Sequence, residues 1–75
     1  MDLKYIKHMM KEKGFTIATL ADRLFISRSN LAKKMIGSRP LREFEALEIC
    51  DVLDLTLKER KRVFSDKEGD KNGKA

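Results

Sequence analysis

Residues 16–40 read TIATLADRLFISRSNLAKKMIGSRP, and this stretch decides the fold. Thr16 is a residue type that caps helix N-termini, because its hydroxyl can accept a hydrogen bond from a free amide of the first turn. The residues that follow give one apolar helical face at the spacing i, i+3, i+4, i+7: Ile17, Leu20, Ala21 and Leu24. The pattern predicts a short amphipathic helix that begins after Thr16.

A second helix is predicted directly afterwards. Only Phe25 and Ile26 separate the first helix from Ser27, which is again a good cap. Leu31 and Met35 would form the inner face of this second helix, and a glycine follows at position 37, where a helix can end in the left-handed conformation. Because so short a connection forces a tight corner rather than an antiparallel hairpin, the pair is predicted to be a helix-turn-helix.

Three further helices are predicted around this pair. One covers about residues 2–13 and ends at Gly14. Another covers about 42–53, with an inward face expected from its apolar residues: Phe44, Leu47, Cys50 and Leu53, joined by Ile49 and Val52. Thr56 and Glu59 form the S/T-x-x-E capping box of a last helix that ends near Phe64.

The fold class expected is therefore all-α: a compact five-helix helix-turn-helix domain over residues 1–64. Residues 65–75 read SDKEGDKNGKA, with no apolar residue except the final alanine, and are expected to form a disordered, flexible polar tail.

The composition argues against an enzyme. A chain of 75 residues supports one small core, and a single Cys with a single His can build neither an intramolecular disulfide nor a zinc site. Cys50 is expected to fill space in the core, and neither a P-loop nor a dinucleotide-binding glycine pattern is present. We expect no catalytic residue, no metal and no cofactor.

The location of the protein is expected to be cytoplasmic. No apolar run reaches the roughly 20 residues that a membrane helix needs, and the N-terminus lacks the apolar segment of a secretory signal. We also expect no second, sensory domain in these 75 residues, so the chain is expected either to act only by occupying its DNA site or to be part of a longer protein.

Charge is distributed unevenly along the chain, whose formal net charge is +5. Six basic residues and no acidic one occur from position 23 to position 42: Arg23, Arg28, Lys33, Lys34, Arg39 and Arg42. Five acidic residues and no basic one occur from position 43 to position 54: Glu43, Glu45, Glu48, Asp51 and Asp54. These carboxylates are expected on the solvent face of their helix, and the basic segment suits a polyanion such as double-stranded DNA.

The helix after Ser27 carries the candidate DNA-binding residues. Four side chains are expected to lie opposite its inner face and to read base edges: Arg28, Ser29, Ala32 and Lys33. Six others are expected to contact phosphates, through helix N-termini or cationic side chains: Thr16, Ser27, Asn30, Lys34, Arg39 and Arg42. Of these, Asn30 and Lys34 sit at the margin of the helix.

The stretch 16–40 resembles the lambda-repressor-like helix-turn-helix family, also called the Cro or XRE family. The resemblance rests on Thr16, on the pair Leu20-Ala21, on the Ile26-Ser27 entry, on Leu31 and on the exit GSRP at 37–40, and it extends over about residues 3–64. It implies a five-helix domain whose third helix lies in the major groove, usually as a dimer on a near-palindromic site.

Three positions depart from the family pattern. Ile17 stands where members often have a glutamine that contacts phosphate, and Phe25 stands where the turn often has glycine, so positive φ would strain it. Lys34 stands where an apolar residue is usual, so its stem is expected to run past the core.

Two functions therefore remain open. The first is a sequence-specific transcriptional regulator, such as a small phage-like or mobile-element repressor. The alternative is a protein-interaction module of the same fold, an antirepressor or adaptor, in which Ile17, Phe25 and Ile36 form an apolar patch. The sequence also leaves open a regulatory protein partner and a homodimer through the last helix, near Leu57, Val63 and Phe64.

Overall fold

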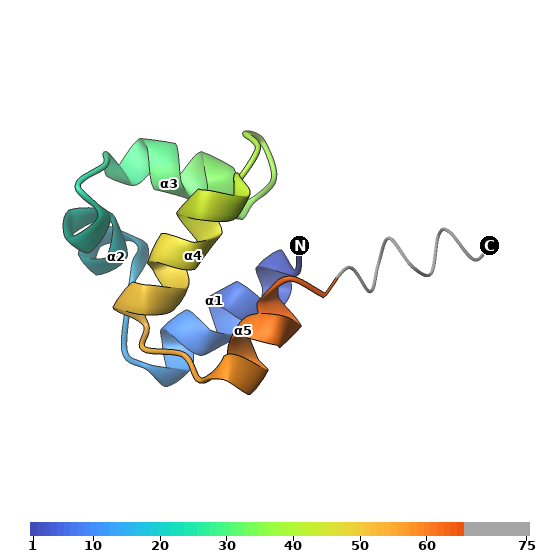
Figure 1. The fold of residues 1–75 in the computed structure, drawn as a ribbon. Helices are drawn as coiled ribbons and strands as arrows, with labels where there is room; N and C mark the ends of the chain where they lie inside the picture. The colour runs from blue at the N-terminus through green and yellow to red at the C-terminus, as the bar shows by residue number, and fades with distance from the viewer. Residues whose placement is uncertain (66–75) are drawn as a thin grey trace.

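The computed structural model describes residues 1–65, and in that range it contains helices and no strand (Figure 1). The helices are α1 (Leu3–Glu12), α2 (Ile17–Leu24), α3 (Arg28–Met35), α4 (Glu43–Val52) and α5 (Leu57–Val63). The all-α, five-helix prediction is confirmed. The predicted polar tail falls almost entirely on residues 66–75, which lie outside the described residues.

Side-chain caps set the starts of four helices. Thr16 and Ser27 accept hydrogen bonds from the backbone N–H groups of Thr19 (3.1 Å) and Asn30 (3.0 Å). At α5 both halves of the predicted capping box are present, because the Thr56 N–H donates to Glu59 Oε1 at 2.9 Å and the Glu59 N–H donates to Thr56 Oγ1 at 3.2 Å. Asp2 caps α1 in the same way, through the Tyr5 N–H at 3.1 Å. The caps predicted at Thr16, Ser27 and Thr56 are therefore present, and Asp2 adds a cap that the sequence analysis did not predict.

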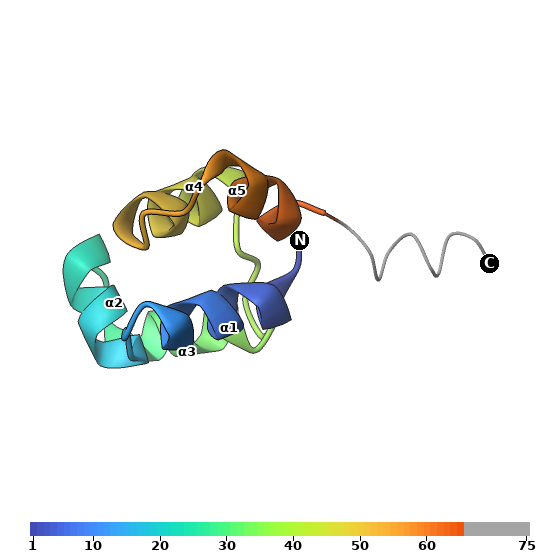
Figure 2. The same ribbon diagram turned by 90° about the horizontal axis from the view of Figure 1, so that it is seen from below.

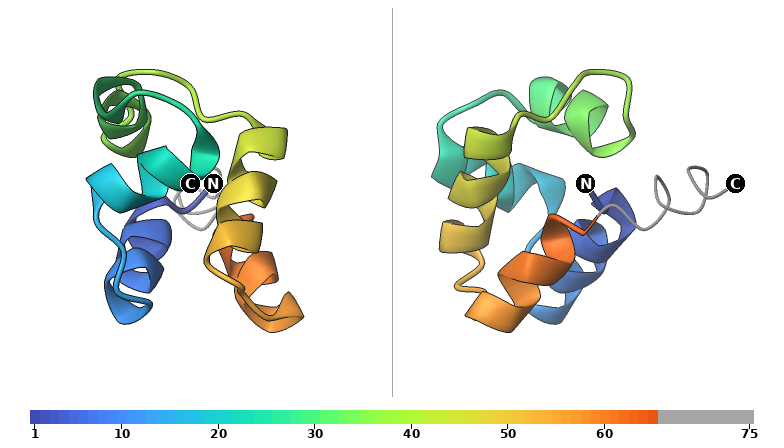
Figure 3. Two further views of the ribbon diagram at one scale, coloured as in Figure 1. Left: turned by 90° about the vertical axis from the view of Figure 1, so that its left-hand side faces the viewer. Right: turned by 45° about the vertical axis from the view of Figure 1, so that its right-hand side comes forward.

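The helices form two layers. Figures 2 and 3 show α4 and α5 in one layer and α1, α2 and α3 in the other. The Asp2 N–H donates to the Val63 carbonyl at 2.9 Å, which ties the start of α1 to the end of α5. Figures 1 and 3 place α3 at one end of the molecule and α5 at the other. The core lies between the layers and consists of the following buried residues: Ile6, Met9, Met10, Leu20, Ala21, Leu31, Met35, Ala46, Ile49, Cys50, Leu53, Leu55 and Val63.

The predicted inner face of α4 was half wrong. Phe44 and Leu47 are exposed, and the buried residues of the helix are Ala46, Ile49 and Cys50. A three-residue step turns a helix by about 300°, so a row spaced by three drifts about 60° at each step and leaves the core face. Phe44 thus lies almost opposite Ala46, and only the C-terminal part of the row is buried.

Two carboxylates of α4 also differ from the prediction of a purely solvated face. Asp51 accepts from Arg60 Nη1 at 2.7 Å, while Arg60 Nε donates to the Leu55 carbonyl at 2.8 Å, so α4 and α5 are joined across their turn. Glu45 is bonded to Lys34 of α3. Glu43, Glu48 and Asp54 are exposed as predicted.

Cys50 is buried as predicted, and burial raises the pKa of its thiol above the ordinary value. A thiol that stays protonated is a poor nucleophile, which agrees with a role in packing. No group of three or more His, Cys, Asp or Glu residues within the described part of the chain could hold a metal ion. No helix found in residues 1–65 is long and apolar enough to cross a membrane.

Candidate nucleic-acid interface

The corner between α2 and α3 depends on an unusual backbone conformation at Phe25. This residue ends α2 in the left-handed region, with φ 61° and ψ 39°, and the next amide, that of Ile26, donates to the Ala21 carbonyl at 3.1 Å. Non-glycine residues rarely adopt positive φ, so the strain expected for this position is present. The corner lets Ser27 cap α3 at once and turns the outer face of α3 away from α2.

The outer face of α3 carries the four predicted base-reading residues. Arg28, Ser29 and Lys33 are exposed and Ala32 is half-buried, whereas Leu31 and Met35 are buried in the core. Neither Arg28 nor Lys33 has an ion-pair partner within residues 1–65. Two cationic side chains are therefore free to meet an anion on this face.

The N-termini of α2 and α3 offer hydrogen-bond donors beside this face. The Ser27 hydroxyl accepts from the Asn30 amide, which leaves its O–H as a donor without an acceptor in the described chain. The first-turn amides of a helix have no intrahelical acceptor and carry partial positive charge. At α2 the Thr16 and Thr19 hydroxyls are already engaged with each other and with the backbone. Ser27 is thus better placed than Thr16 to donate to a phosphate.

Arg39 is positioned beside α3 by two contacts. Its Nη1 donates to Asn30 Oδ1 at 3.4 Å, and its backbone N–H donates to the Lys33 carbonyl at 3.2 Å, just after Gly37 ends the helix at φ 85°. Asn30 is half-buried and Arg39 is exposed. The structure therefore brings these two predicted phosphate contacts together. Arg42 lies farther along the chain, as the N-cap of α4, with its side chain exposed.

Lys34 departs from its predicted role as a phosphate contact. Its ammonium is bonded to the Glu45 carboxylate, and its side chain is only 12% exposed. Glu45 also accepts the Arg42 backbone N–H at 2.8 Å. The Lys34 hydrogen bond, followed by that of the Arg42 amide, holds the pKa of Glu45 below its ordinary value. The Lys34 charge is thus used inside the domain, and we do not include this residue in the interface.

Glu45 is the residue that the sequence analysis missed. It lies 11 positions after Lys34 and reaches it across the gap between α3 and α4. The only signal in the sequence that could have indicated this ion pair was Lys34 itself, whose stem was expected to run past the core. A nearly buried ammonium group requires an acidic partner.

Two apolar side chains are exposed around α3. Phe25 is 93% exposed and Ile36 is 72% exposed. Ile17, the third member of the predicted apolar patch, is half-buried and packs against the core.

A family model describes residues 5–59 of the chain, and its description is a Cro/C1-type HTH DNA-binding domain. The chain belongs to this family. The match contains α2, α3, α4 and the corner at Phe25, so it confirms the resemblance drawn from residues 16–40. A Cro/C1-type domain is a DNA-binding regulator in general, and this agrees with an exposed, basic outer face on α3.

Two further comparisons gave no match. Neither the curated proteins nor the solved structures contain one that is significantly similar to this Cro/C1-type domain. The identity of the DNA-contacting residues therefore depends on the geometry of α3 and its neighbours.

Proposed function

We propose that this Cro/C1-type domain is a sequence-specific transcriptional repressor of the small phage-like or mobile-element kind, and that it inserts α3 into the major groove. The observation that carries the proposal is the outer face of α3. Arg28, Ser29 and Lys33 are exposed there, and neither cation has an acidic partner in the described chain. A major groove is wide enough to admit one helix, and arginine pairs bidentately with guanine O6 and N7.

The assigned roles follow from position on α3. Arg28, in the first turn, is proposed to read guanine, and Ser29 accepts or donates at a neighbouring base. Ala32 permits close approach or contacts a thymine methyl, and Lys33 reaches guanine or phosphate. Ser27, Thr16, Asn30, Arg39 and Arg42 are proposed to hold the phosphates on either side, which fixes the register of the helix.

An electrophoretic competition experiment tests this function. The domain is incubated with labelled promoter fragments, including the DNA upstream of its own coding sequence, against an excess of bulk DNA. A repressor retains at least one fragment under this competition. Loss of every fragment to bulk DNA would show that the domain does not read sequence.

The second candidate function is a protein-interaction module, such as an antirepressor or adaptor. The exposure of Phe25 and Ile36 favours it, because apolar side chains beside a DNA-facing surface provide a docking patch for another protein. The competition experiment separates the two functions, since an adaptor of this kind would bind all fragments equally and weakly.

We also propose a homodimer through α5. Leu57 begins this helix and is 71% exposed, whereas Val63 is buried in the domain's own core and Phe64 is half-buried. Because α5 lies at the end of the molecule opposite α3, this dimer leaves both proposed DNA-reading faces free. A two-fold dimer matches a near-palindromic site.

A further inference from the structure

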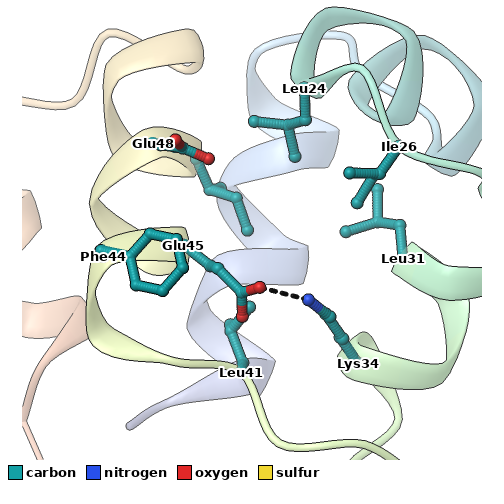
Figure 4. A pocket seen from close by; sticks show the side chains of 9 residues that line it. Leu24, Ile26, Leu31, Lys34, Leu41, Phe44, Glu45 and Glu48 are labelled. Carbon is teal, nitrogen blue, oxygen red and sulfur yellow. Dashed lines mark hydrogen bonds and ion pairs between the residues drawn. The ribbon is translucent and has the colours of Figure 1, made fainter.

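A pocket of about 150 Å³ lies at the seam where α3 meets α2 and α4 (Figure 4). Its lining is mostly apolar, with three ionisable residues: Leu24, Ile26, Leu31, Leu41, Phe44 and Ile49, with Lys34, Glu45 and Glu48. Figure 4 shows Leu24, Ile26 and Leu31 on one side and Phe44 and Leu41 on the other, with the bond between Lys34 and Glu45 joining the two sides. The ion pair between Lys34 and Glu45 thus connects α3 and α4 at one edge of the pocket, and the apolar side chains line the space beside it.

The size and lining of the pocket indicate the body of its ligand. An apolar cavity of roughly 150 Å³ lined by leucine, isoleucine and phenylalanine is large enough to bind benzene. One six-membered ring or one branched alkyl group would therefore fill the space.

The charge at the pocket indicates the polar part of the ligand. Lys34 and Glu45 neutralise each other. The Glu48 carboxylate has neither an ion-pair nor a hydrogen-bond partner within residues 1–65. Among the residues that line this pocket, the only charge without a partner is therefore the negative charge of Glu48, which would attract a cationic ligand. Residues 66–75, DKEGDKNGKA, contain lysines but no large apolar side chain, so this part of the chain has no group that fills the pocket.

We propose that this pocket binds a small organic amine with one compact apolar group, the ring or branched alkyl group seated between α3 and α4 and the ammonium beside Glu48. Such a ligand would touch Leu31, on the side of α3 opposite Ser29 and Lys33. The site therefore does not overlap the proposed DNA-reading face, and its existence does not rest on DNA binding.

The test is an NMR titration of the 15N-labelled full chain with three probes of one shape: benzylamine, benzyl alcohol and benzoate. We expect saturable shifts confined to the amides of α3 and of residues 41–49, with a dissociation constant on the order of 1 mM for benzylamine, as for other fragments of this size. Benzylamine should bind about threefold more tightly than benzyl alcohol, and benzoate should bind most weakly, since an exposed ion pair contributes little more than this.

Two variants make the test specific. Glu48→Gln should remove the preference for benzylamine over benzyl alcohol, whereas Glu43→Gln, an exposed acid on the same helix outside the pocket, should leave it unchanged. Both positions are exposed, so both variants should fold. The proposal is overturned if benzylamine shifts do not saturate, if they spread over the whole surface, or if Glu48→Gln leaves the preference intact.

Discussion

The Lys34 ammonium bonds to the Glu45 carboxylate and thereby joins α3 to α4, with the two side chains only 12% and 22% exposed. The same carboxylate accepts the Arg42 N–H at the start of α4. The Glu45 side chain thus caps α4 and also holds α3, the helix that is proposed to enter the major groove. The position of α3 therefore depends on a residue outside the helix-turn-helix.

Removing the Lys34 charge should destabilise the domain. We expect Lys34→Ala to lower the free energy of unfolding by about 1–2 kcal/mol, because it leaves a partly buried carboxylate without its counter-charge. Lys33→Ala, one residue earlier and exposed, is the matched control and should change stability by less than about 0.5 kcal/mol. Urea denaturation followed by circular dichroism measures both, and equal effects would mean that the ion pair does not stabilise the fold.

The ion pair should also make stability depend on pH. The Lys34 and Arg42 hydrogen bonds hold the pKa of Glu45 below its ordinary value of 4.5. Since the folded pKa is lower than the unfolded one, the contribution is fully present above about pH 4.5 and is lost as pH falls through the folded pKa. The wild type should therefore be more stable than Glu45→Gln at pH 7, and the difference should shrink below about pH 4.5. Thermal unfolding across this range checks it; a difference that stays constant with pH would contradict the assigned cause.

The sequence predicted the helix starts well and the side-chain partners less well. Thr16, Ser27 and Thr56 act as caps because capping is local, involving residues three positions apart. Lys34 was predicted to contact phosphate because the sequence alone shows no acidic partner for it. Its partner, Glu45, lies on another helix, and no local sequence pattern reveals a contact between distant elements. Phe44 was assigned to the core because a spacing of three resembles a helical face over one turn but drifts away from it over three turns. The base-reading roles of Arg28 and Lys33 stay predictions, because they depend on contacts with DNA and not on contacts within the chain.

Phe25 should be a position at which the fold can be stabilised. Its φ is 61° and its side chain is 93% exposed, so it adds strain and buries little. We expect Phe25→Gly to raise the free energy of unfolding by about 0.5–1 kcal/mol, because relief of left-handed strain exceeds the entropy that glycine adds to the unfolded chain. Phe25→Ala keeps the strain and should give no such gain; a gain equal to that of glycine would attribute the effect to the side chain instead.

Arg28 and Arg39 should differ in what they contribute to DNA binding. Arg28→Ala should cost about 1–3 kcal/mol on the preferred site and relax base preference at one position. Arg39, placed by Asn30 beside the end of α3, should weaken all sequences alike when replaced by alanine and reduce the salt dependence. A binding assay over a library of single-base variants measures both effects. Equal, sequence-blind losses would contradict the division of roles.

Leu57 should control self-association through α5. Sedimentation velocity over a range of concentrations should show a monomer-dimer equilibrium for the wild type and a monomer for Leu57→Glu, because the charge would be buried at the interface. Lys58→Ala, next to it and exposed, should change the equilibrium far less. A wild type that stays monomeric at the highest concentration would reject the dimer.

The central claim, that α3 reads a DNA sequence, is tested most directly by titrating the domain against the duplex upstream of its own coding sequence and against a scrambled duplex of equal composition. Fluorescence anisotropy at two salt concentrations, about 50 and 200 mM, separates charge attraction from base reading. We expect tight, salt-sensitive binding that favours the upstream duplex at both concentrations. Weak binding, equal for the two duplexes and lost at the higher salt, would contradict the account and leave only general attraction of a basic surface to DNA.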